Sequence, residues 1–137
     1  MALTHLVDTS VISRLGAPAV RAVLDPLTEA GKVGRVGIID LEIGFGSRNA
    51  REWDQNMADL SVFMLVETTA AHVQRARQVQ RLLAARSQRG RKIPDLLIAA
   101  AAEQERLTLI HYDSDFDLIA KVTGQRCQWV VPAGAID

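Results

Sequence analysis

The sequence has little of several residue types, and each scarcity argues against a class of protein. It contains one cysteine, Cys127, which cannot form a disulfide within the chain, and we expect a buried structural thiol in a reducing compartment. The three histidines show no paired ligand spacing and CxxC is absent, so a zinc site is poorly supported. No apolar run approaches the roughly 18 residues that span a bilayer, and the first ten residues do not have the regions of a signal peptide. We therefore expect a cytoplasmic protein with no membrane partner.

The charge and aromatic content limit what can be said about ligands. The formal net charge is zero, with 16 basic and 16 acidic residues, so the molecule as a whole should not attract nucleic acid indiscriminately, although local patches still can. Aromatic residues make up only 4% of the chain, and stacking on unpaired bases cannot be predicted from so few. With 137 residues, 48% of them hydrophobic, the chain fits a single compact domain over residues 1–137.

Short β-type runs alternate with helical stretches along the chain. The expected strands are Thr4–Asp8, Val33–Ile39, Phe63–Glu67, Leu107–Tyr112 and Cys127–Val131. Apolar strands separated by helices favour a three-layer α/β/α sandwich with a mostly parallel central sheet. We expect the last six residues, PAGAID, to form a loose tail.

Two helices are well marked. Between Thr69 and Ser87, apolar residues recur near a 3.6-residue period, which is typical of an amphipathic helix. A second helix is predicted from Pro94, because proline is favoured in a first turn, Asp95 suits the positive end of the helix dipole, and the alanines that follow allow close packing.

Acidic residues lie far apart in the sequence, each at the edge of an apolar stretch. They are Asp8, Glu42, Asp95, and the run Asp113, Asp115 and Asp117. Ligands of an open parallel sheet bind beyond the carboxyl ends of its strands. Asp8 ends the first expected strand, Glu42 follows the second, and Asp113 and Asp115 follow the fourth. Asp95 would have to reach the same edge from the first turn of its helix.

Each acid also has a structural explanation. Asp8 can cap a helix, Glu42 can interact with a helix dipole, and Asp113 can hold a turn. Asp40, two residues before Glu42, competes with it for any functional place. Taken together, however, gathered carboxylates repel one another unless a cation neutralises them. Hard oxygen ligands favour Mg²⁺, with Mn²⁺ possible, and such ions commonly act on phosphate esters.

Basic residues are concentrated just before Asp95. The interval between Glu67 and Asp95 contains no acid and carries seven of the sixteen basic residues: Arg75, Arg77, Arg81, Arg86, Arg89, Arg91 and Lys92. A polyanion could lie along them, although a solvated helix face with arginine stems on apolar surface explains most of them equally well. Arg89, Arg91 and Lys92 are the preferred candidates for binding phosphate.

With these residues in hand, the sequence resembles a PIN-domain ribonuclease, and specifically a VapC-type toxin of a toxin–antitoxin pair. The resemblance covers essentially the whole chain. Its pieces are VDTSVI with Asp8, LEIGFGS with Glu42 and then Gly46, IPDLLIAAAA with Asp95, and HYDSDFDLI before the last strand. Singly each is weak, but their order and spacing together make a fairly specific match.

The resemblance implies an activity, ligands and partners. Asp8, Glu42, Asp95 and a late aspartate would hold Mg²⁺ or Mn²⁺ and activate water to cleave an RNA phosphodiester. Asp113 and Asp115 both match the late position, whereas Asp117 is expected on the surface. Thr9 or Ser10 would orient Asp8 or a metal-bound water. A homodimer is implied, together with a cognate antitoxin whose tail blocks the acidic cleft.

Alternatives from other classes remain open at this point. A receiver-like signalling module that binds Mg²⁺ fits the length and alternation, but it would carry two adjacent acids after its first strand and an aspartate after the third, where this chain has Glu67. A phosphatase of the haloacid-dehalogenase type would carry a second acid at the position of Ser10. A PIN domain kept only for binding is a third possibility.

Overall fold

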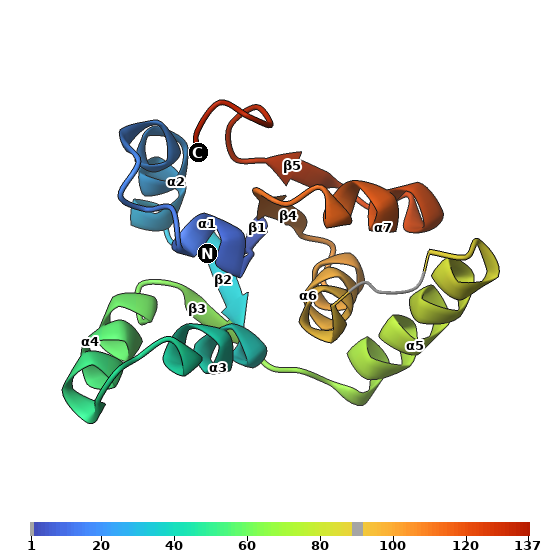
Figure 1. Cartoon of the computed structure of the whole chain (residues 1–137), viewed down its shortest axis with the longest axis horizontal. Coiled ribbons are helices and arrows are strands. Elements are labelled where there is room, and N and C mark those ends of the chain that lie inside the picture. Colours follow the sequence, from blue (N-terminus) through green and yellow to red (C-terminus); the bar gives the residue numbers. More distant parts are fainter. Residues whose placement is uncertain (1, 89–91) are drawn as a thin grey trace.

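The computed structural model describes residues 2–88 and 92–137, and in these residues five strands form one sheet (Figure 1). The strands are β1 (His5–Val7), β2 (Val33–Val36), β3 (Met64–Val66), β4 (Thr108–His111) and β5 (Cys127–Trp129). Their order across the sheet is β3-β2-β1-β4-β5, and every pairing is parallel. The predicted parallel α/β fold is confirmed.

Helices connect and flank the strands. They are α1 (Thr9–Ile12), α2 (Pro18–Glu29), α3 (Gly37–Phe45), α4 (Ala50–Leu60), α5 (Ala70–Ala85), α6 (Ile93–Gln104) and α7 (Asp115–Thr123). Figure 1 shows α3 beside α4 and α5 beside α6, and contacts join both pairs. None of the helices in the described part of the chain is long and apolar enough to cross a membrane.

The core surrounds the two central strands that lead to the acidic residues. Leu6 of β1 and Leu109 of β4 are completely buried. Helix α6 packs against this sheet through Ile98 and the buried run 99–102 of alanines. Because alanine side chains are short, the backbone of α6 can approach the sheet closely. This packing fixes the end of α6 that carries Asp95 beside the ends of β1 and β4.

The second strand is shorter than predicted. We expected Val33–Ile39, but β2 ends at Val36 and α3 begins at Gly37. A short buried apolar run does not distinguish a strand from the buried face of a helix, and Ile39 is completely buried on α3. Glu42 therefore lies in the middle of α3. Each of the other strands is two residues shorter than predicted.

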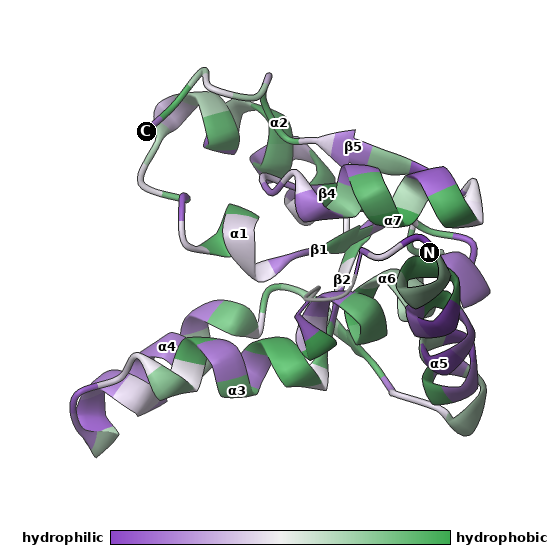
Figure 2. Ribbon diagram, turned by 45° about the vertical axis from the view of Figure 1, so that its right-hand side comes forward, coloured by the Kyte–Doolittle hydropathy of each residue, from purple (hydrophilic) through white to green (hydrophobic). Residues whose placement is uncertain are grey.

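Both marked helices are confirmed. Thr69 caps α5 by accepting a hydrogen bond from the His72 backbone N–H (3.1 Å), and the His72 Nδ1 accepts one from the Thr69 N–H (3.3 Å). Pro94 lies in the first turn of α6. Figure 2 shows α5 as largely hydrophilic, which agrees with a solvated face for most of its arginines.

The prediction of a loose carboxyl-terminal tail was wrong. The Tyr112 hydroxyl donates to the Ile136 carbonyl (2.6 Å) and accepts from the Gly134 N–H (3.0 Å). Arg14 forms an ion pair with Asp137. These contacts join residues far apart in sequence, which composition alone could not reveal.

Cys127 is partly buried on β5, and burial raises the pKa of its thiol to about 11. The thiol therefore stays protonated at neutral pH, as expected of a structural cysteine.

Candidate metal centre

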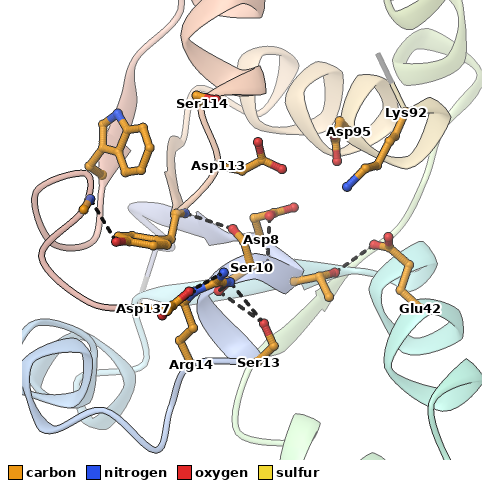
Figure 3. A pocket seen from close by; sticks show the side chains of 14 residues that line it. Asp8, Ser10, Ser13, Arg14, Glu42, Lys92, Asp95, Asp113, Ser114 and Asp137 are labelled. Carbon is orange, nitrogen blue, oxygen red and sulfur yellow. Dashed lines mark hydrogen bonds and ion pairs between the residues drawn. The ribbon is translucent and has the colours of Figure 1, made fainter. Parts of the chain in front are cut away.

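One pocket collects the acidic residues that the sequence scatters (Figure 3). Asp8, Glu42, Asp95 and Asp113 line it, and they come from the end of β1, from α3, from α6 and from the segment after β4. These positions meet because β1 and β4 are neighbouring parallel strands whose carboxyl ends share one edge of the sheet.

Asp8 combines a structural role with a place in the pocket. Its Oδ2 accepts a hydrogen bond from the Ser10 backbone N–H (2.9 Å), so it caps α1. The side chain is nevertheless 97% removed from solvent, with a relative exposure of 3%. Burial raises the pKa of Asp8, the neighbouring Glu42 charge adds to the rise, and the hydrogen bonds from Ser10 oppose it. Asp8 can therefore cap α1 and still present its carboxylate to a ligand in the pocket.

Asp95 has an unsatisfied carboxylate. It is 5% exposed, and its Oδ2 has no hydrogen-bond partner among residues 2–88 and 92–137. Burial is the main cause that raises the pKa of Asp95 to about 7, and the charges of Asp8 and Asp113 raise it further, while Lys92 lowers it. A buried oxygen without a partner costs free energy. A cation bound here would remove that cost.

Asp113 and Asp115 both lie next to Asp95. One carboxylate oxygen from each of the three lies within 4.8 Å of the others. The Asp113 Oδ1 also accepts a hydrogen bond from the Asp115 backbone N–H (2.9 Å), and the Asp113 N–H donates to the His111 Nδ1 (3.2 Å). The structure thus brings both late candidates together. Asp117, by contrast, is exposed and accepts a hydrogen bond from the Trp129 indole (3.1 Å).

Glu42 faces the pocket, whereas Asp40 does not line it. The Thr9 hydroxyl donates to the Glu42 Oε1 (2.7 Å), which fixes the carboxylate on the side of the pocket nearer α3. Asp40 accepts from the Arg35 Nε (2.8 Å) in a partly buried ion pair. This ion pair engages Asp40 outside the pocket, and a local sequence pattern could not predict it.

Ser10 connects the segments that follow β1 and β4 by a hydrogen bond. Its hydroxyl accepts a hydrogen bond from the Tyr112 backbone N–H (2.9 Å), 102 residues away in sequence. Because Asp8 and Asp113 lie on either side of this bond, Ser10 holds their backbones in register.

Cations also line the pocket. Lys92 lies beside Asp95, as Figure 3 shows. The other two preferred phosphate candidates, Arg89 and Arg91, lie outside the described residues. Arg14 lines the pocket as well, together with Tyr112 and Trp129. Tyr112 and Trp129 were not predicted from sequence.

Metal binding fits this set of residues. Every carboxylate offers hard oxygen donors, and Asp95 has an oxygen without a partner among the described residues. Burial raises the pKa values of Asp8 and Asp95, and the charges of neighbouring carboxylates raise them further. A bound cation would reverse both effects. The pocket can therefore hold a metal ion.

Comparisons with known proteins agree with this architecture. Residues 5–122 match the family model described as "PIN domain". The chain is 64% identical to Ribonuclease VapC51 of Mycobacterium tuberculosis strain H37Rv over 137 residues, which cover 100% of both proteins. It is 39% identical to Ribonuclease VapC21 of the same organism, over 98% of this chain and 99% of that protein.

Solved structures show the same fold. DNA-bound VapBC from Salmonella typhimurium superposes with a TM-score of 0.78 at 17% identity, over 94% of this chain and 99% of that one. FitAcB from Neisseria gonorrhoeae superposes with a TM-score of 0.71 at 23% identity, over 93% and 98%.

Proposed function

This chain belongs to the PIN-domain family, and from that membership we propose that it is a metal-dependent endoribonuclease acting as the toxin of a type II toxin–antitoxin pair. The observation that carries the proposal is the buried Asp95 carboxylate, which is surrounded by other acids and has an oxygen without a partner among the described residues. A full-length relative at 64% identity is named a ribonuclease.

The ion we propose is Mg²⁺, with Mn²⁺ as the alternative, because both prefer oxygen ligands and retain water. Asp8, Glu42, Asp95, Asp113 and Asp115 would hold it. When bound, such an ion polarises a phosphoryl group and lowers the pKa of a water molecule.

The residues of the chain itself prepare the site. Thr9 orients Glu42 through its hydroxyl, and Ser10 orients Asp8 through its backbone N–H while its hydroxyl holds the Tyr112 backbone. Supporting hydrogen bonds of this kind keep ligands in position before the substrate arrives. Lys92, with Arg89 and Arg91, would hold phosphates of the RNA near Asp95.

Partners follow from the same proposal. RNA is the substrate, the active form is a homodimer in the cytoplasm, and a cognate antitoxin protein blocks the acidic pocket. Large apolar side chains exposed on and near α3, α4 and β3 support an assembly that covers them: Leu41, Phe45, Trp53, Val62, Met64 and Leu65. Phe45 is 92% exposed.

The direct test is cleavage of single-stranded RNA by the purified protein. We expect cleavage with Mg²⁺, none in EDTA, and a loss of at least about 100-fold in Asp8→Asn or Asp95→Asn, since supporting residues alone are worth roughly 10- to 100-fold. Asp25→Asn is the matched control, because it removes the same charge from an exposed position on α2. Full activity of either site variant, or cleavage in EDTA, would contradict the proposal.

The toxin role has a separate test in cells. Expression should arrest growth and fragment RNA, and co-expression of the cognate antitoxin should restore growth. Asp95→Asn is the control that should not arrest growth. High-level accumulation of folded protein without a growth defect would contradict the toxin assignment. That result would still be compatible with a PIN domain that only binds its ligand.

A further inference from the structure

An ion pair within the chain occupies one side of the pocket. The Arg14 Nε donates to both carboxylate oxygens of Asp137, at 3.3 and 3.0 Å, and the Arg14 Nη2 lies 2.9 Å from the Asp137 Oδ2. The carboxylate therefore covers the Nε–Nη2 edge of the guanidinium. Both residues line the pocket that holds Asp8, Asp95 and Asp113.

Arg14 is held in place by groups other than Asp137. Its Nη1 donates to the Ser10 carbonyl (2.8 Å), and its guanidinium carbon lies 4.8 Å from the centre of the Tyr112 ring. The Arg14 side chain is 29% exposed, against 56% for Asp137. If the Asp137 carboxylate left, the carbonyl and the ring would still orient Arg14.

The covered edge is suited to phosphate. Guanidinium groups bind phosphate and carboxylate alike through two parallel N–H donors. An ion pair with a partner this exposed is worth little, typically under about 1 kcal/mol, so another anion can replace Asp137 easily. Phosphate would meet a guanidinium that is already oriented.

The position of Arg14 relates this edge to the acidic residues. Figure 3 shows Arg14 and Lys92 on opposite sides of the acidic side chains. A single RNA strand that passes over those acids would carry phosphates toward both cations. Without Arg14, the described pocket residues would offer no positive charge on the side of the path away from Lys92.

We propose that Arg14 binds an RNA phosphate beside the acidic centre, and that Asp137 occupies the same guanidinium edge until RNA displaces it. The inference rests on the proposed ribonuclease function for the identity of its ligand. It adds a second phosphate site, on the side of the pocket away from Lys92, and makes the carboxyl-terminal segment a competitor of the substrate.

Equilibrium binding of a labelled single-stranded oligoribonucleotide in EDTA tests this, because no metal is then present to support cleavage. Asp137→Asn should tighten binding, roughly two- to fivefold, since the competing carboxylate is lost. Arg14→Gln should weaken binding and reduce the slope of log K against log salt by about 0.7, the value for one phosphate contact on a single strand. The double variant should bind as Arg14→Gln does, because Asp137 acts through Arg14 alone.

Matched controls separate this effect from a general change of charge. Asp25→Asn and Arg21→Gln change exposed residues of α2 by the same charges, and both should bind as the wild type does. The proposal is overturned if Asp137→Asn binds no more tightly than Asp25→Asn, or if Arg14→Gln keeps the wild-type slope. It is also overturned if Asp137→Asn tightens binding equally with and without Arg14.

Cleavage in Mg²⁺ is measured on the same proteins. If the wild type does not cleave RNA while the Arg14 and Asp137 effects on binding hold, the ribonuclease proposal fails and the phosphate site stands. If the wild type cleaves while both variants bind as it does, the phosphate site fails and the ribonuclease proposal stands.

Discussion

At the scale of single residues, the pocket places charge where the protein alone stabilises it poorly. Asp95 is buried beside Asp8 and Asp113, and its pKa is raised to about 7. Burial is also the main cause that raises the pKa of Asp8. Both groups therefore resist ionisation in the protein without metal, and a divalent cation is the ligand that makes their charged forms favourable.

The raised pKa of Asp95 predicts how stability varies with pH in the absence of metal. The folded state keeps a proton that the unfolded state, with a pKa near 3.8, has lost, so stability should fall as pH rises from about 4 to about 7 and then level off. Asp95→Asn should reduce that fall. At pH 8 in EDTA the variant should melt at or above the wild-type temperature, with roughly 4 °C for each kcal/mol gained.

Thermal melting between pH 4 and 8 in EDTA measures this difference, and repeating it with Mg²⁺ supplies the control. Mg²⁺ should stabilise the wild type and have little effect on Asp95→Asn, because a ligand stabilises only the state that binds it. A wild type that melts above the variant at pH 8 in EDTA would show that the Asp95 charge is already compensated within the protein.

At the scale of elements, the two central strands and α6 form a rigid support, and a less regular segment closes one side of the pocket. Residues after β5 are held by the Tyr112 hydroxyl, which bonds Gly134 and Ile136. Tyr112 itself immediately follows β4. The Arg14–Asp137 ion pair also holds it, and Ile136 packs against the core. Because few contacts join this segment to the rest of the protein, its stability should be local.

Tyr112→Phe should release this segment without unfolding the domain. The ring that contacts Arg14 is kept, while the hydrogen bonds to residues 134–136 are lost, at a net cost of about 1 kcal/mol for each bond confined to the segment. Hydrogen exchange measured by NMR should become faster at the Gly134 and Ile136 amides. Amides of buried α6 residues such as Ile98 are the internal control and should keep wild-type rates. Unchanged exchange at Ile136 would mean that other contacts hold the segment.

At the scale of the whole molecule, a chain of zero net charge must bind RNA through local positive groups. The described part of α5 contributes less than its sequence suggested, because Arg75 forms an ion pair with Glu103 of α6 (2.5 Å). Lys92 lines the acidic pocket directly. Among the described residues, the basic side chains that line the acidic pocket are therefore Lys92 and Arg14.

Replacing Arg89, Arg91 and Lys92 together by Gln should therefore weaken RNA binding with little effect on the chemical step. Each lost phosphate contact should reduce the slope of log K against log salt by roughly 0.7. The cleavage rate at saturating RNA should change much less than the affinity, whereas Asp95→Asn should lose the rate itself. Binding in EDTA across a salt series, with single-turnover cleavage in Mg²⁺, measures both. An unchanged slope would mean that the three residues are solvated surface charges that do not contact RNA phosphates.

The sequence by itself predicted the alternation of strands and helices and most of the acids that gather in the pocket. Alternating apolar strands and helices predicted the parallel sheet, and Pro94 with the following alanines predicted the helix that presents Asp95. These features were readable because local periodicity and first-turn preferences act over a few residues. Asp8 follows β1 and Asp113 comes shortly after β4. In a parallel sheet both strands end at the same edge, so the predicted parallel sheet also predicted that these two acids lie at one edge.

The tertiary structure alone decided the features that depend on distant partners. Glu42 was distinguished from Asp40 by the side chains that contact each, Thr9 and Arg35, and its place on α3 depended on burial of a run that could equally have been a strand. The tail was fixed by Tyr112 and by an ion pair spanning 123 residues. No local pattern encodes such contacts, because they form only when the sheet has brought the two segments together.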